Sequence, residues 1–161
     1  MNRIGDNLIC VASNEEIVKA FSAFGVEFIL VGGLAVSWYC SSRQANDMDI
    51  LVNPTKGNSE KVADALGSLG LKGFLSDSFA KAGVQAPIKQ FHYADIITPA
   101  RSGLTFEDLL KESIVGKLFN ITVHIPSVEN LIKLKESAVA SAQKELSKHQ
   151  EDIVLLRSRA I

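Results

Sequence analysis

Two aspartates one residue apart, Asp47 and Asp49, are the side chains in this sequence whose spacing first suggests chemistry. They open an apolar segment that predicts a β-strand, in which residues i and i+2 point to one face, about 6.5–7 Å apart. Two neighbouring carboxylates suit Mg²⁺ or Mn²⁺, because these hard cations prefer oxygen ligands. Without a metal or a basic partner their charges would repel. The alternative is a strand edge at which both carboxylates meet water.

A glycine pair, Gly32-Gly33, ends the preceding apolar run, which we expect to be a buried strand that leads straight into a helix. Because glycine has no Cβ, a phosphate can approach the backbone N–H groups at the start of such a helix. The sequence contains neither G-x-G-x-x-G nor G-x-x-x-x-G-K-[ST], so the common nucleotide-binding loops are excluded. A tight turn without a ligand is the alternative interpretation.

A third carboxylate, Asp95, lies within the apolar segment FHYADIIT. A carboxylate in a buried strand is unfavourable unless it is paired or bound to a metal. Alternatively, Asp95 ends a strand and bonds to local backbone. A phosphate-accepting turn and metal-binding carboxylates on neighbouring strands would together form a nucleotide–metal site.

Hydrophobic periodicity and turn residues predict the elements that must position these groups. Strands alternate with helices, which indicates an α/β or α+β domain. The stretch 73–87 has no clear assignment. Helices are expected over about 13–24, 33–40, 62–69, 106–111, 127–142 and 145–157, and strands over about 27–31, 48–52, 89–98 and 121–125.

Length, charge and cysteine content exclude several classes of protein. The chain has 161 residues, the size of one ordinary domain, and a net charge of −1, so it is no overall polycation for nucleic acid. Cys10 and Cys40 fit no metal-ligand or disulfide spacing, which favours a reducing cytoplasm. The longest apolar run, 28–39, is broken by glycines and is too short to span a bilayer.

The glycine pair and the aspartate pair occur in the segment VGGLAVSWYCSSRQANDMDILV, which resembles the nucleotidyltransferase superfamily of the DNA polymerase β type. More narrowly, it is similar to the minimal and AbiEii-like bacterial nucleotidyltransferases. Two C-terminal segments, IPSVENLIKLKESA and KHQEDIVLLR, also resemble that family, with His149 where an aspartate is usual. The resemblance covers most of the chain apart from about 76–90. The matching positions are Gly32, Gly33, Ala35, Arg43, Asp47 and Asp49.

The resemblance implies a mixed β-sheet flanked by helices over 1–125, with a C-terminal helical pair over 126–161 packed on it as part of a single domain. It also implies transfer of a nucleoside monophosphate from an NTP to an acceptor hydroxyl, with release of pyrophosphate. Asp47 and Asp49 would hold Mg²⁺, and Asp95 would help to hold a second ion or take the acceptor's proton. The Gly32-Gly33 backbone would bind phosphate.

Two cationic residues complete the site that the resemblance implies. Lys135 lies in the middle of the apolar stripe of its predicted helix, where a lysine either snorkels outward or has an anionic partner. The resemblance implies that this partner is the triphosphate or the metal-binding carboxylates. Arg43, in the loop before the aspartates, would bind phosphate or the acceptor, or else be solvated. By contrast, Lys148 and Asp152, four residues apart, are expected to form a surface ion pair.

Two other functions stay open on the sequence alone. One is a catalytically inactive, nucleotide-binding or antitoxin-type subunit that works with a partner protein, which gains weight if Asp95 does not approach the aspartate pair. The other is an ordinary interaction domain. The acceptor is unidentified: RNA such as a tRNA end, a protein, or a small molecule such as an aminoglycoside or another nucleotide. A local basic patch for RNA would comprise Lys133, Lys144, Lys148, Arg157 and Arg159.

Overall fold

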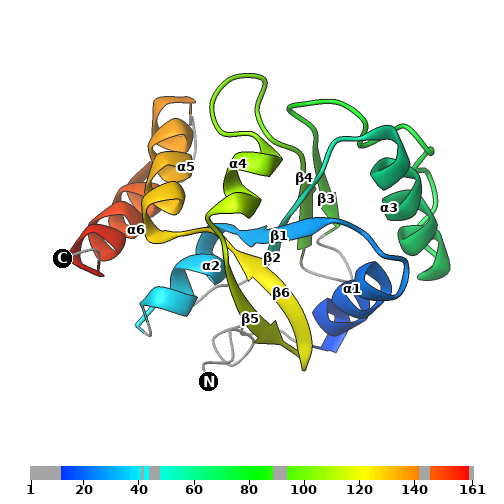
Figure 1. The fold of residues 1–161 in the computed structure, drawn as a ribbon, viewed down its shortest axis with the longest axis horizontal. Helices are drawn as coiled ribbons and strands as arrows, with labels where there is room; N and C mark the ends of the chain where they lie inside the picture. The colour runs from blue at the N-terminus through cyan, green and yellow to red at the C-terminus, as the bar shows by residue number, and fades with distance from the viewer. Residues whose placement is uncertain (1–11, 41, 44–47, 89–93, 142–145, 160–161) are drawn as a thin grey trace.

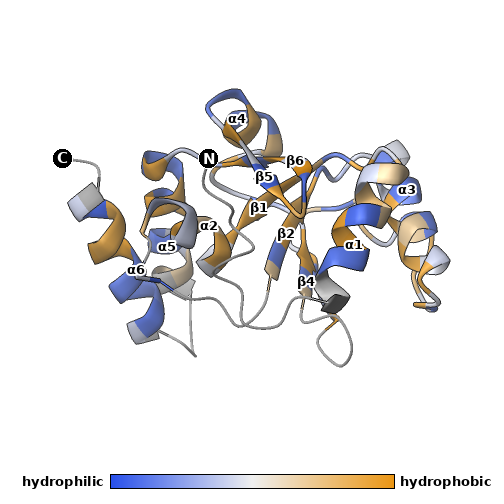
Figure 2. Cartoon of the chain, turned by 90° about the horizontal axis from the view of Figure 1, so that it is seen from below, coloured by the Kyte–Doolittle hydropathy of each residue, from blue (hydrophilic) through white to orange (hydrophobic). Residues whose placement is uncertain are grey.

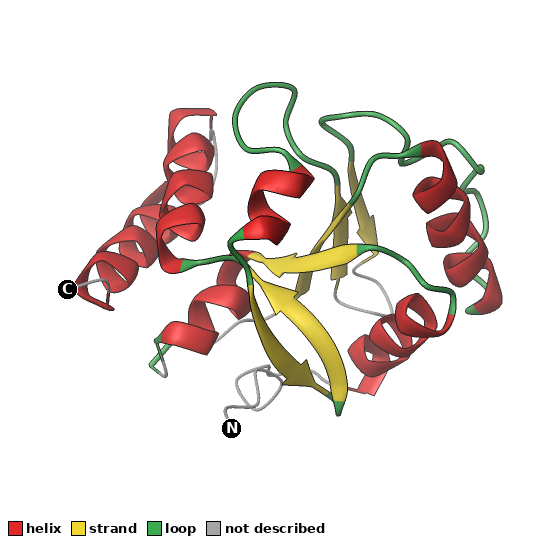
Figure 3. Ribbon diagram, viewed as in Figure 1, coloured by secondary structure: helices red, strands yellow, loops and turns green. Residues whose placement is uncertain are grey.

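The computed structural model describes residues 12–40, 42–43, 48–88, 94–141 and 146–159 (Figure 1). Strands and helices alternate in this part of the chain, as the periodicity predicts, and the structure is a mixed α/β fold (Figure 3). The elements are α1 Ala12–Ala23, β1 Phe28–Val31, α2 Gly32–Tyr39, β2 Met48–Val52, α3 Lys56–Ser68, β3 Gln85–Ile88, β4 Ala94–Ile97, α4 Phe106–Lys111, β5 Ile114–Leu118, β6 Ile121–Ile125, α5 Val128–Ser141 and α6 Leu146–Arg159.

The main sheet is mixed, with strand order β1-β2-β4-β3. Strand β2 pairs antiparallel with β1 and parallel with β4, while β3 pairs antiparallel with β4. A separate hairpin of β5 and β6 packs beside β1. The expected mixed sheet flanked by helices is therefore confirmed.

Alternation along the strands divides the core between the two faces of the sheet. On β2, Met48, Ile50 and Val52 are fully buried among residues of α1 and α3. Leu51 points to the opposite face, where it packs in a second cluster with Phe106 of α4 and, at its margin, Leu134 of α5. Figure 2 shows hydrophobic residues along the central strands and hydrophilic ones on α1 and α6. Because the face that bears Leu51 also bears Asp49, helix α5 lies over the candidate site.

Two strands escape prediction because each contains a residue that disfavours strands. Strand β3 includes Pro87, which is tolerated because β3 is at the edge of the sheet. Strand β5 includes Gly116, where a Cβ would come within 2.9 Å of Ile125 and 3.0 Å of Trp38. The expected strand 89–98 is described only from Ala94, since 89–93 lie outside the described residues.

The C-terminal helices form the expected pair. Helix α5 begins after Ser127, whose hydroxyl accepts a hydrogen bond of 3.1 Å from the backbone N–H of Asn130. Helices α5 and α6 pack against each other and against α2. This packing brings His149 and Asp152 of α6 close to the glycine turn. Within the described ranges, none of the helices is long and apolar enough to cross a membrane.

Candidate active site

The turn from β1 into α2 places the glycine pair at the start of a helix. Gly32 has a φ of +69°, a backbone conformation that residues other than glycine rarely adopt. A Cβ at Gly32 would overlap the carboxylate of Asp49, so the backbone and that carboxylate approach closely. The preceding residue, Val31, has an aliphatic side chain and cannot cap the helix. The first N–H groups of α2 are thus suited to an anion.

Asp49 and Asp95 lie directly opposite each other on the parallel strands β2 and β4. Parallel neighbours are about 4.8 Å apart and paired residues point to the same face, so the two carboxylates share one surface. Asp95 is only 6% exposed. Two carboxylates this close together, one of them buried, favour a bound cation or a shared proton.

Asp47, the other expected ligand, lies outside the described residues. Within the described ranges, no three His, Cys, Asp or Glu residues cluster closely enough to hold a metal by themselves. The part of the expected carboxylate set that the structure brings together is therefore the pair Asp49 and Asp95.

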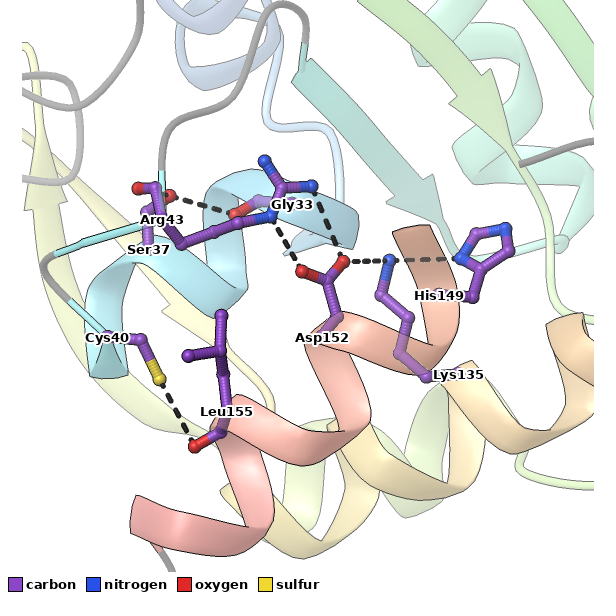
Figure 4. A network of polar contacts seen from close by, with 8 residues as sticks. All are labelled: Gly33, Ser37, Cys40, Arg43, Lys135, His149, Asp152 and Leu155. Carbon is purple, nitrogen blue, oxygen red and sulfur yellow. Dashed lines mark hydrogen bonds and ion pairs between the residues drawn. The ribbon is translucent and has the colours of Figure 1, made fainter. Parts of the chain in front are cut away.

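Lys135 extends from α5 into a buried ion pair with Asp152 of α6. Its Nζ lies 3.0 Å from Oδ2 of Asp152 and 3.3 Å from Nδ1 of His149 (Figure 4). The Lys135 side chain is 9% exposed, so it does not snorkel to the surface. An ammonium group can only donate, so His149 accepts at Nδ1 in this arrangement. The anionic partner expected for a buried lysine is present within the protein.

Arg43 reaches the same carboxylate from the other side. Its Nε donates to Oδ1 of Asp152 at 2.6 Å, and its Nη2 lies 3.4 Å from Oδ2. The guanidinium passes close to Gly33, where a Cβ would come within 2.5 Å of Nη2. The hydroxyl of Ser37 lies 2.9 Å from the carbonyl oxygen of Gly33 and 2.7 Å from that of Arg43, and so ties the loop to α2 (Figure 4).

Asp152 connects these two cations and is ionised. Burial raises the pKa of its carboxyl. The hydrogen bond from Arg43 and the charge of Lys135 lower it by more, so the pKa lies below its ordinary value. Its side chain is 1% exposed. The expectation that Asp152 forms a surface ion pair with Lys148 is therefore wrong, because α6 turns Asp152 inward against α2 and α5.

A small cavity of about 180 Å³ adjoins these residues. Its polar walls come from Gly32, Asp49, Lys135 and His149, and the remaining walls are apolar. Asp95 is the strand partner of Asp49, which lines the cavity. Arg43 binds Asp152, which also binds the cavity residue Lys135. Of the predicted site residues, the fold gathers the glycines, Asp49, Asp95, Arg43 and Lys135 into one region.

Comparison with known structures identifies the fold. The chain resembles ANT(2″)-Ia, solved in complex with adenylyl-2″-tobramycin, over 91% of this chain and 87% of that one, with a TM-score of 0.57 and 14% identity. It also resembles an antigenic nucleotidyltransferase-like protein from Paracoccidioides brasiliensis, over 89% of this chain and 74% of that one, with a TM-score of 0.50 and 12% identity. The chain has a nucleotidyltransferase fold. No protein-family model and no curated protein matches the sequence.

Two residues of this nucleotidyltransferase fold were missed as site residues by the sequence reasoning. Asp152 carries a recognisable signal, since it lies four residues before Leu156, on the buried side of α6, where a carboxylate needs a partner. His149 lies one helical turn before Asp152 and lines the cavity. Both come from the C-terminal helix, so their approach to the glycine turn depends on tertiary packing.

Proposed function

We propose that this protein is a metal-dependent nucleotidyltransferase, which transfers a nucleoside monophosphate from an NTP to an acceptor hydroxyl and releases pyrophosphate. The observation that carries this proposal is the pairing of Asp49 with Asp95, beside a cavity that also exposes the Gly32 turn and Lys135. Acidic ligands for a cation and groups that bind phosphate are then side by side. The fold shared with nucleotidyltransferases supports the same conclusion.

The residues at this site fit Mg²⁺ or Mn²⁺. Asp49 and Asp95 offer carboxylate oxygens from neighbouring strands, and the missing side chain at Gly32 leaves room for the carboxylate of Asp49 itself. We propose Asp47 as a further ligand, because it precedes Asp49 by two residues. When bound, the metal would neutralise charge on the phosphates during in-line displacement.

The protein's own groups have separate roles in the proposed reaction. The N–H groups at Gly32 and Gly33, with the ammonium of Lys135, bind the β- and γ-phosphates. Asp95 accepts the proton of the acceptor hydroxyl while the oxygen of that hydroxyl forms a bond to the α-phosphorus. The bond from that phosphorus to the bridging oxygen breaks, and pyrophosphate leaves. Arg43, held by Asp152, adds positive charge beside the glycine turn.

The approach of Asp95 to Asp49 removes the reason to prefer a binding-only subunit. An inactive or antitoxin-type subunit that works with a partner protein is the alternative function. Among the described residues, no contact favours it. We also propose that the protein belongs to the minimal, AbiEii-like nucleotidyltransferases, on the segment VGGLAVSWYCSSRQANDMDILV and the C-terminal segments IPSVENLIKLKESA and KHQEDIVLLR.

Transfer of label from NTPs labelled at the α-phosphate, with Mg²⁺ and with RNA or cell lysate as acceptor, tests the proposal. Asp49→Asn and Asp95→Asn should each abolish transfer, whereas Asp64→Asn, the same change on the exposed side of α3, should leave it intact. Transfer that persists in Asp49→Asn contradicts the assignment. Metal-dependent NTP binding without transfer by the wild type would favour the binding-only alternative.

A further inference from the structure

A second, larger cavity of about 690 Å³ adjoins the candidate active site. It lies between α5, the β3–β4 edge of the sheet and the segment that follows β4. The two cavities have four wall residues in common, so they lie side by side. The volume of the larger one falls within the range of about 300–1,000 Å³ that is typical of small-molecule sites. The shared residues are Leu51, Ile97, Leu134 and Ala138.

The sheet order places this larger cavity on the side from which an acceptor would attack. Going across one face, Gly32 follows β1, Asp49 is on β2, Asp95 is on β4, and the large cavity lies at β4 and β3. In an in-line displacement the attacking and leaving oxygens lie on opposite sides of the phosphorus. With pyrophosphate at the glycine turn, the attacking hydroxyl enters from the β4–β3 side.

The charge of this cavity indicates what it can accept. Among the described residues that line it, Lys133 is the only one with a charged side chain. Its Nζ lies 3.5 Å from Glu129, but both side chains are more than half exposed, so this pair is weak. Most other lining side chains are apolar, and the uncharged polar ones are Gln85, Thr98, Ser102 and Ser137. No acidic side chain is present among these lining residues to attract a cation.

We propose that this cavity binds the acceptor, and that the acceptor is a hydroxyl compound with an apolar body and no positive charge. The inference rests on the proposed function and deepens it. It separates this protein from ANT(2″)-Ia in substrate chemistry, because the tobramycin moiety bound there carries several amino groups, which are cationic at neutral pH. A polycation would lose hydration in this cavity without gaining an anionic partner.

Three small probes that share a hydroxymethylphenyl group and differ in charge test this assignment: benzyl alcohol (neutral), 4-(hydroxymethyl)benzoate (anionic) and 4-(hydroxymethyl)benzylamine (cationic). Their binding to the full chain is measured by ligand-observed NMR with Mg²⁺ and ATP present, after ATP binding alone has been measured by calorimetry. We expect the alcohol and the carboxylate to bind together with ATP, and the amine to bind about tenfold more weakly than the carboxylate. Tobramycin should not bind.

Two variants locate the probe site. Ser102→Trp, which fills the cavity from an exposed bend, should abolish probe binding while the circular dichroism spectrum is retained. Lys133→Glu should weaken the carboxylate about fivefold and strengthen the amine. Lys72→Glu makes the same charge change at an exposed residue outside both cavities and should alter neither.

The outcomes separate this inference from the proposed function. If ATP binds but displaces the probes, the cavity holds the nucleoside and the inference is overturned. Equal binding of amine and carboxylate, binding of tobramycin, no probe binding at all, or unchanged probe binding in Ser102→Trp also overturns it. Failure of ATP to bind in the presence of Mg²⁺ overturns the proposed function, and this inference with it.

Discussion

Lys135 and Asp152 form a buried ion pair of 3.0 Å that joins α5 to α6. Asp152 also accepts from Arg43, so one carboxylate holds both cations that lie beside the glycine turn. We infer that Asp152 is a positioning residue, which acts on phosphate binding through Lys135 and Arg43. A buried charge needs its partner, so stability and site geometry depend on the same contact.

Asp152→Asn should destabilise the protein by about 3–5 kcal/mol, because it leaves two buried or half-buried cations without their counter-charge. Denaturant unfolding of the variant and of the wild type measures this change. Asp64→Asn, on the exposed side of α3, is the matched control and should change the free energy of unfolding by less than about 0.5 kcal/mol. A loss below about 1 kcal/mol in Asp152→Asn would show that the ion pair contributes little.

Stability should fall in acid through the same residue. The pKa of Asp152 is lower in the folded protein than its ordinary value of about 3.9, so its contribution is fully present above about pH 4. That contribution is lost as the pH falls from there through the folded pKa, because protonation removes the charge that Arg43 and Lys135 need. Free energies of unfolding measured between pH 7 and pH 3 should therefore drop more in the wild type than in Asp152→Asn. Parallel curves would contradict the assignment.

Gly32→Ala should disrupt both the fold of the turn and NTP binding. The substitution forces a side chain into a positive φ, at about 1–2 kcal/mol, and also drives a Cβ into Asp49. Gly70→Ala separates these effects, because Gly70 has a φ of +79° but nothing within 4 Å of the added Cβ. Thermal unfolding and calorimetry with Mg-ATP compare the two variants. Gly70→Ala should lose stability only, and equal losses of stability in both would remove the role given to the contact with Asp49.

Lys135→Met should weaken Mg-ATP binding by about tenfold or more, while AMP binding changes little, because the ammonium is assigned to the β- and γ-phosphates. Methionine keeps most of the apolar stem, so packing on α5 is retained. Calorimetry with both nucleotides measures the difference. Lys61→Met, on the exposed side of α3, serves as the control. If ATP and AMP affinities fall equally, Lys135 supports the fold and not the triphosphate.

Much of the site was predictable because its signals are local. A glycine pair between a buried strand and a helix, and the place of Asp49 on the next strand, follow from backbone sterics and the two-residue repeat of a strand. The helical repeat likewise placed Lys135 on the buried face of α5, where the structure has it. Strands β3 and β5 were missed because they contain Pro87 and Gly116. The sequence does not show that Pro87 lies on an edge strand, or that Ile125 and Trp38 leave no room for a side chain at Gly116.

The sequence by itself determined the alternation of helices and strands, the turn at Gly32 and the side of its strand on which Asp49 lies, because neighbouring residues set each of these. Only the tertiary structure decided that Asp95 pairs with Asp49, since strand order and register depend on how distant segments pack. It also decided that Asp152, 109 residues from Arg43 along the chain, lies inside and not on the surface. A charge pattern along one helix cannot reveal which side the rest of the protein will cover.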